Sequence, residues 1–328
     1  MMRSRLYTKL TGLLFLLATL CGFASTSARA QTYPSKPITI VVPFPAGGGT
    51  DVVFRSISAK LQATLGVPVV IDNRSGAGGT VGTATGAKAA PDGYTLIAAT
   101  TTTIASAKAV YPKLGYDPVA SLAPITTLGT TPFVLVTTPS LPATTLAGFI
   151  AYAKAHKGEI NYGSIGNGSA SHLVAELFKQ RVGIDMAHIP YRGAGPAQAD
   201  LMAGQIQVLF DNPTALVQQV RAGRMRALAI TEPSAVFQDL PTFAAAGVAK
   251  FTPELWYGLM APAETPKPIV AHLHAALKQV LEDREVRADM LSKGVTPLLL
   301  TPESFAGKIR TDIELWGGIA RSVDAKVE

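Results

Sequence analysis

Short β-branched runs alternate with segments of helical period along almost the whole chain, and this alternation limits the fold more than any other feature. The run 38–42 precedes Val53, Ile57 and Leu61, which recur every four residues as on one helix face. The same pattern predicts strands at 38–42, 67–71, 94–99, 132–137, 160–163, 205–210, 225–230 and 256–260, and helices at 146–156, 171–180, 268–281 and 286–292 and from Thr301-Pro302 onward. Strands that alternate with helices favour an α/β fold with mostly parallel sheets.

The N-terminus has the pattern of a secretory signal peptide. Basic residues lie within 3–9, an apolar run covers 10–23, and Ala28-Arg29-Ala30 resembles a cleavage site. The apolar run is shorter than the roughly 20 residues of a membrane span. A lipoprotein interpretation through Cys21 is disfavoured because the bulky Leu20 precedes the cysteine. We therefore predict a signal peptide at 1–30 and an exported, soluble protein that starts near Gln31.

Cysteine content and charge exclude several classes of protein. Cys21 is the only cysteine, so the predicted mature chain forms no disulfide and has no cysteine nucleophile or cysteine metal ligand. Four of the cations lie in the leader, which reduces the formal charge from +7 to about +3. Without a basic cluster, nucleic acid is not an expected partner. The remaining chain is long enough for two domains, and its two similar α/β halves follow one another without a linker.

A glycine-rich loop at 43–51 joins the first predicted strand to the first predicted helix. Its sequence is Pro-Phe-Pro-Ala-Gly-Gly-Gly-Thr-Asp, and the glycines allow a ligand to approach the backbone closely. The N–H groups at such a helix start attract a carboxylate or phosphate. Thr50 or Asp51 is expected to cap the helix. A tight structural turn is the alternative interpretation.

A second loop of this kind lies at 163–169, again between a strand and a helix. Its N–H groups, with the hydroxyls of Ser164 and Ser169, are candidates to hold another oxyanion. His172 follows on the same helix. Two anion-ready helix starts in different halves of the chain fit one ligand held between two domains, so a binding role is favoured over a structural one.

Other polar positions leave two interpretations open. Asp211 ends an apolar strand, where it either meets a ligand amine or hydroxyl or caps the next helix. Thr101 and Thr102 follow another strand and either donate to a ligand or cap a helix. Arg192, in a loop between strand and helix, is expected to face solvent. A third glycine cluster at 76–82 fails the dinucleotide spacing, because Val81 stands at the third glycine position, and it predicts a structural turn.

The enzymatic alternatives have little support in the sequence. Residues 162–166 approach the Gly-x-Ser-x-Gly pattern, but Tyr162 occupies the first glycine position. A triad built on Ser164 or Ser169 also needs an orienting acid. The five histidines form no His-Glu-x-x-His motif, and His272 and His274 point in different directions on one helix. A periplasmic serine hydrolase therefore remains only a minor alternative.

The order of motifs resembles that of the Bug family, the periplasmic receptors of tripartite tricarboxylate transporters. The resemblance runs from about Tyr33 to the C-terminus. The residues that carry it are Pro43-Phe44-Pro45-Ala46-Gly47 with Gly49-Thr50-Asp51, Asn73-Arg74, Gly76-Ala77-Gly78-Gly79, Pro91-Asp92-Gly93-Tyr94, Gly166-Asn167-Gly168-Ser169, Glu176-Leu177-Phe178, Pro190-Tyr191-Arg192-Gly193, Phe210-Asp211, Trp256-Tyr257-Gly258-Leu259 and Ala261-Pro262.

This resemblance implies a two-domain periplasmic-binding-protein fold of the Venus-flytrap kind, type II-like, with the ligand in a cleft between domains. Domain 1 would combine residues 31–131 with 254–328, and domain 2 would span 132–253. A small carboxylate would be held mostly by N–H groups, hydroxyls and water, and a monomeric receptor would deliver it to membrane transporter subunits. The expected ligand-binding residues are Phe44, Ala46, Gly47, Gly48, Asp51, Thr101, Thr102, Ser164, Gly166, Asn167, Gly168, Ser169, His172 and Asp211, without catalytic residue, metal or cofactor.

One segment departs from the family pattern. Where many relatives have Thr-His followed by Asn-Pro, residues 101–106 read Thr-Thr-Thr-Ile-Ala-Ser. This segment can line the cleft, so the ligand stays open among amino-dicarboxylates, tricarboxylates, aromatic acids and nicotinate-like acids. A sensory binding protein that signals to a periplasmic sensor domain is the second interpretation.

Overall fold

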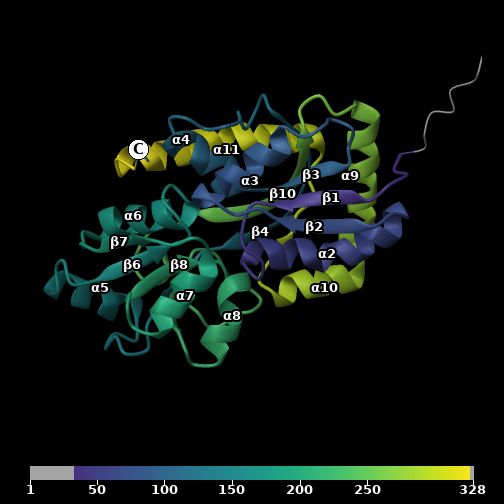
Figure 1. Cartoon of the computed structure of the whole chain (residues 1–328). Helices are drawn as coiled ribbons and strands as arrows, with labels where there is room; N and C mark the ends of the chain where they lie inside the picture. The colour runs from purple at the N-terminus through teal and green to yellow at the C-terminus, as the bar shows by residue number, and fades with distance from the viewer. Residues whose placement is uncertain (1–32, 326–328) are drawn as a thin grey trace, which may run out of the picture. The chain divides into compact units, whose positions relative to one another are not determined.

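The computed structural model describes residues 33–325, so the predicted signal peptide and Cys21 lie outside the described residues. The residues from Lys36 onward form a compact unit of their own, and the following description concerns this unit (Figure 1). Within the described residues, no helix is both long enough and apolar enough to cross a membrane.

The first of two sheets combines strands from both ends of the described chain. Its order is β11-β4-β10-β3-β1-β2. The strands are β1 (Ile38–Val42), β2 (Val69–Asn73), β3 (Thr95–Thr100), β4 (Leu122–Pro132), β10 (Glu254–Pro262) and β11 (Thr296–Pro297). In Figure 1, α3 and α11 lie on one face of this sheet, and α2 and α10 lie on the other.

The second sheet is built from the middle of the chain. Its order is β7-β6-β8-β5-β9. The strands are β5 (Val134–Thr137), β6 (Asn161–Ser164), β7 (Ala187–Pro190), β8 (Val208–Asp211) and β9 (Arg226–Ile230). Sheet membership therefore changes at Phe133, between β4 and β5, and again between β9 and β10.

The prediction of mostly parallel sheets is wrong. β1 is parallel to β2 and β3, and β6 is parallel to β7 and β8. The other pairs are antiparallel: β10 with β3 and β4, β11 with β4, and β5 with β8 and β9. The antiparallel pairs arise where the chain passes between the sheets. β4 continues through Phe133 directly into β5 of the other sheet, whereas two parallel strands need a long crossover, usually a helix, between them. β4 itself was not predicted, because prolines at both ends and Gly129 interrupt its apolar pattern.

The helices agree closely with the predicted ranges where both exist. They are α2 (Gly49–Leu65), α3 (Thr80–Ala87), α4 (Ala107–Val110), α5 (Leu146–Ala155), α6 (Ala170–Val182), α7 (Ala194–Met202), α8 (Pro213–Arg221), α9 (Lys267–Glu282), α10 (Arg284–Ser292) and α11 (Pro302–Ser322), with a 3₁₀ turn η1 (Ala77–Gly79) and a π-helical turn η2 (Thr102–Ser106). Thr301 caps α11 by accepting a hydrogen bond from the Ser304 N–H, as predicted.

Each sheet has its own apolar core, which fixes the loops that follow the strands. Trp256 packs edge-on against Phe305 beside the first sheet, and its indole N–H donates to Asp312 at 2.7 Å. Val134 and Leu209 belong to the core of the second sheet. The glycine loops thus start from strands that are buried and well packed.

Candidate functional site

The start of α2 presents free backbone donors. Gly48 is the N-cap residue (φ −74°, ψ 164°) and has no side chain to cap the helix. The first N–H groups of a helix have no partner inside the helix. Among residues 33–325, no side chain accepts from the N–H groups of Gly49, Thr50 or Asp51. The first turn of α2 is therefore open to an external acceptor.

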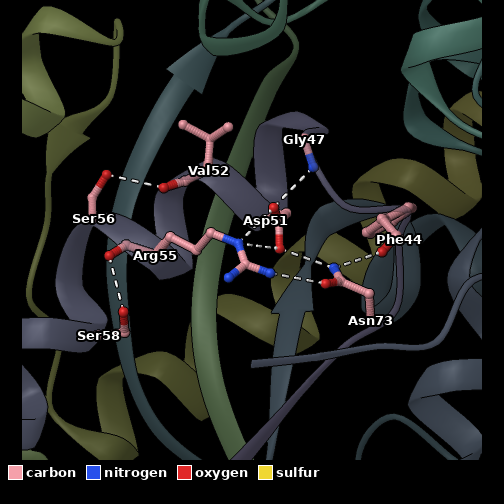
Figure 2. Close-up of polar contacts among 8 residues, drawn as sticks. All are labelled: Phe44, Gly47, Asp51, Val52, Arg55, Ser56, Ser58 and Asn73. Carbon is pink, nitrogen blue, oxygen red and sulfur yellow. Dashed lines mark hydrogen bonds and ion pairs between the residues drawn. The ribbon is translucent and has the colours of Figure 1, made fainter. Parts of the chain in front are cut away.

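Asp51 holds the preceding loop in place instead of capping the helix (Figure 2). Its Oδ2 accepts from the Gly47 N–H at 2.9 Å, and Arg55 Nε donates to both carboxylate oxygens. Asn73 Nδ2 donates at 3.0 Å both to Asp51 Oδ1 and to the Phe44 carbonyl. Burial opposes the charge of Asp51, but the hydrogen bonds from Arg55, Gly47 and Asn73 outweigh it and lower the carboxyl pKa.

A cavity of about 680 Å³ opens at this helix start. Segments from both sheets line it, including the starts of α2, α7 and α8. Its lining includes Phe44, Pro45, Ala46, Gly47, Gly48, Gly49, Thr50, Thr100, Thr102, Phe133, Gly193, Ala194, Gly195, Gln198, Asp211, Asn212, Thr214 and Tyr257. Of the predicted residues, Phe44, Ala46, Gly47, Gly48, Thr102 and Asp211 line this cavity, and Asp51 does not.

The start of α7 is a second open helix N-terminus on the same cavity. Gly193 is its N-cap residue and provides no side-chain cap. At φ 114°, Gly193 has a backbone conformation that side chains disfavour, and a Cβ there would lie 2.9 Å from Pro45 Cγ. The sequence pattern singles out only Arg192 in this loop, and Arg192 is exposed as predicted. The succession strand, glycine, helix at 187–195 was the signal that could have identified it.

The loop at 163–169 has a different role in this conformation, because acceptors within the protein occupy most of its N–H groups. Ser169 caps α6 through the His172 N–H, and the Ala170 N–H donates to Thr102 Oγ1 at 3.2 Å. The Gly168 N–H donates to His172 Nδ1, and the Gly166 N–H to Ser164 Oγ.

The remaining predicted residues of this region lie beside the main cavity. Gly166 and Asn167 line a neighbouring cavity of about 520 Å³, which Phe44 and Gly193 also line. Ser164, Gly168, Ser169 and His172 line neither cavity, and nor does Thr101, whose Oγ1 accepts from the Trp256 N–H at 3.0 Å.

Ser164 meets a histidine, but the pair lacks the features of a hydrolase site. Ser164 Oγ lies 2.7 Å from His188 Nε2, and the His188 ring stacks on His172 with centroids 4.0 Å apart. Within the described part of the chain, no carboxylate hydrogen-bonds to His188 to orient it. Burial, with smaller contributions from His172 and Lys179, lowers the pKa of His188 to about 3. Ser164 is fully buried, so no substrate reaches its hydroxyl.

Asp211 and Tyr257 are buried polar residues that line the main cavity and are incompletely satisfied. Asp211 Oδ1 accepts from the Asn212 N–H at 2.8 Å and from Asn212 Nδ2 at 2.9 Å. Asp211 Oδ2 and the Tyr257 hydroxyl have no hydrogen-bond partner among the described residues. Burial raises the pKa of Asp211 to about 6, against the opposing Asn212 hydrogen bond and the nearby Gln198 amide, whose Nε2 donates to the Ala215 carbonyl at 3.0 Å. No group of three or more His, Cys, Asp or Glu side chains suited to a metal ion occurs within residues 33–325.

Comparison with known proteins decides the family. Residues 53–324 match the model of the tripartite tricarboxylate transporter family receptor, TctC. The chain belongs to the TctC family. Protein BugT of Bordetella pertussis is 37% identical to this TctC-family chain over 324 residues, covering 98% of this chain and 99% of BugT. The resemblance to the Bug family is thereby confirmed, and solved structures of relatives confirm a periplasmic-binding-protein fold with two α/β sheets.

Two solved structures of relatives contain carboxylates. An R. palustris protein with adipate is 34% identical with a TM-score of 0.87, covering 90% of this chain and all of that one. MatC from Rhodopseudomonas palustris with bound malate is 35% identical with a TM-score of 0.83, covering 88% of this chain and 99% of MatC. The family is one of solute-binding receptors.

Proposed function

We propose that this protein captures a small carboxylate in the periplasm and delivers it to the membrane subunits of a tripartite tricarboxylate-type transporter. In this proposal the chain is exported by a signal peptide cleaved near residue 30 and acts as a monomer without a cofactor. Residues 31–131 and 254–328 form one domain and 132–253 the other. The observation that supports the proposal best is the pair of open helix starts, α2 and α7, on one cavity.

Electrostatics favour an anion at this place. A helix N-terminus carries roughly half a positive charge, and its free N–H groups donate to carboxylate oxygens. Two cationic side chains also line the cavity: Lys293 forms an ion pair with Asp289 and donates to Ser56, and Arg221 lies at an exposed position. In this proposal the main-chain donors of α2 and α7 hold the carboxylate.

Two uncapped helix starts on one cavity offer a place for each end of a dicarboxylate. Adipate and malate, with which two relatives were solved, are both dicarboxylates. We place one ligand carboxylate at the first turn of α2 and assign the start of α7 to a second acceptor group of the ligand.

A pair of substitutions at Gly48 tests the binding site. Gly48→Asp places a carboxylate at the N-cap, where it competes for the free N–H groups of α2. Gly48→Ala adds the same Cβ, 3.3 Å from the Pro45 carbonyl oxygen, without a capping group. Calorimetry against a panel of mono-, di- and tricarboxylates is expected to show saturable wild-type binding, at least a tenfold loss in Gly48→Asp, and a smaller loss in Gly48→Ala.

Stability measurements separate this effect from misfolding, because Gly48→Asp should unfold within about 1 kcal/mol of wild type. No binding of any carboxylate by the wild type, or equal binding by both variants, would contradict the site. Delivery is tested by uptake of the labelled acid in a strain that lacks this protein. Uptake that is unchanged in this strain would contradict the transport role and favour a sensory one.

A further inference from the structure

Asp211 is buried, and a buried carboxylate destabilises the folded protein unless hydrogen-bond donors reach both of its oxygens. It ends β8, its side chain lines the main cavity, and the residue is 3% exposed. Asn212 provides both donors to Oδ1, and Oδ2 has no partner within residues 33–325. A buried acceptor without a partner lowers the folding stability by at least as much free energy as the loss of a hydrogen bond.

A second buried group of the same kind reaches the cavity from the other sheet. Tyr257 lies in β10, is fully buried, and its hydroxyl has no partner among the described residues. Burial raises the pKa of this hydroxyl and the charge of nearby Asp211 raises it further, against a smaller opposing effect of the Thr214 hydroxyl, which itself donates to the Lys293 carbonyl. The hydroxyl therefore keeps its proton, so it is able both to donate and to accept a hydrogen bond.

Asp51 shows that the fold satisfies a buried carboxylate when its role is structural. Asp51 is 2% exposed, as buried as Asp211, yet both of its oxygens accept hydrogen bonds from Gly47, Arg55 and Asn73. The two carboxylates lie near the same cavity, but only the one that lines it has an unpaired oxygen. This contrast points to a donor that comes from the ligand.

We propose that Asp211 Oδ2, together with the Tyr257 hydroxyl, accepts a hydrogen bond from a hydroxyl or ammonium group that the ligand carries beside its carboxylate. This inference rests on the proposed function and narrows its ligand class to hydroxy- and amino-carboxylates. A plain acid of the same length puts only a methylene group next to Oδ2 and leaves it unpaired. A hydrogen bond to a charged group makes the donor-bearing acid about tenfold to a hundredfold tighter.

Matched acids test the proposal directly. Calorimetry compares propionate, lactate and alanine, then succinate, malate and aspartate, then glutarate, 2-hydroxyglutarate and glutamate. Members of each set differ only in the group on the carbon beside the carboxylate. At the chain length that binds, the hydroxy or amino acid should bind at least tenfold more tightly than the plain acid. Which of the two is preferred separates a hydroxyl ligand from an ammonium ligand.

Two variants of the cavity wall assign the preference to these residues. Asp211→Asn keeps an acceptor for Asn212 and replaces the free oxygen with a donor, so the preference should fall to about threefold or less while the plain acid binds as before. Tyr257→Phe removes only the hydroxyl and should reduce the preference in the same direction. Asp185→Asn, at an exposed position outside the cavity, is the matched control and should change nothing.

The outcomes distinguish the two proposals. If the plain acids bind as tightly as their hydroxy and amino counterparts, the inference about Asp211 is wrong and the carboxylate receptor stands. If Asp211→Asn weakens all acids of a set equally, Asp211 supports the fold and does not select the ligand, which also overturns the inference. If no acid in any set binds, and the wider carboxylate panel also fails, both proposals fall.

Discussion

The titration of Asp211 should make the folding stability measurably dependent on pH. Its pKa rises from an ordinary value of 3.8 to about 6 in the folded protein. Between these values the folded state binds more protons than the unfolded state, so stability falls as pH rises through this window. At about 1.36 kcal/mol for each pH unit, the difference corresponds to about 3 kcal/mol, of which about 2–3 kcal/mol develops between pH 4 and 7.5.

The assay is urea unfolding of the ligand-free protein and of Asp211→Asn at several pH values from 4 to 7.5. His188 acts in the opposite direction, because its lowered pKa costs stability as pH falls below its ordinary value of 6.5. That contribution is the same in both proteins and cancels in their difference. The neighbours Tyr257 and Asn212 do not titrate in this window. The stability of wild type relative to the variant should fall by about 2–3 kcal/mol toward pH 7.5, and a difference independent of pH would refute the reasoning.

Two further substitutions test the construction of the site. Gly193→Ala should lower carboxylate affinity at least tenfold and destabilise the fold by about 1–3 kcal/mol, because of its positive φ and the contact with Pro45. Gly307→Ala, in α11 outside the cavity and with open space around it, should do neither; equal effects of the two variants in calorimetry and thermal unfolding would contradict this. Asn73→Ala removes the two hydrogen bonds that Asn73 donates to the loop before α2 and should lower the unfolding free energy by about 1–3 kcal/mol. Arg74→Ala removes only an exposed ion pair and should lower it by less than about 1 kcal/mol. A similar loss in both variants, measured by urea unfolding, would contradict the role of Asn73 in holding this loop.

Local periodicity was enough to predict most elements that contain it. The strand 38–42 has the predicted bounds, and the helix predicted at 146–156 is observed as α5, one residue shorter. β4 escaped prediction because its prolines and glycine conceal a strand that is stabilised by pairing with β10 and β11. Strand direction was also beyond local pattern, since it depends on where the chain passes between sheets.

The candidate site shows the same division. The loop before α2 was predicted from its glycines, and its helix start is open as expected. The loop at 163–169 has equally suggestive glycines, but a distant hydroxyl, that of Thr102, accepts from the Ala170 N–H. Tyr257 was missed because a tyrosine inside an apolar strand normally signals only core packing. Whether a donor or acceptor is already satisfied depends on tertiary contacts that no single segment encodes.

In the proposed site, main-chain donors at α2 and α7 hold the carboxylate, and this affects how such a receptor diversifies during evolution. Apart from proline, no substitution deletes a backbone N–H group, so the proposed donors to the carboxylate persist while side chains around the cavity mutate. Changes at positions such as Thr102, Asp211 or Tyr257 then alter which acid fits, without rebuilding the part that every acid shares. The receptor encoded by a duplicated gene would therefore keep carboxylate binding and would need only a few substitutions to become specific for a different acid.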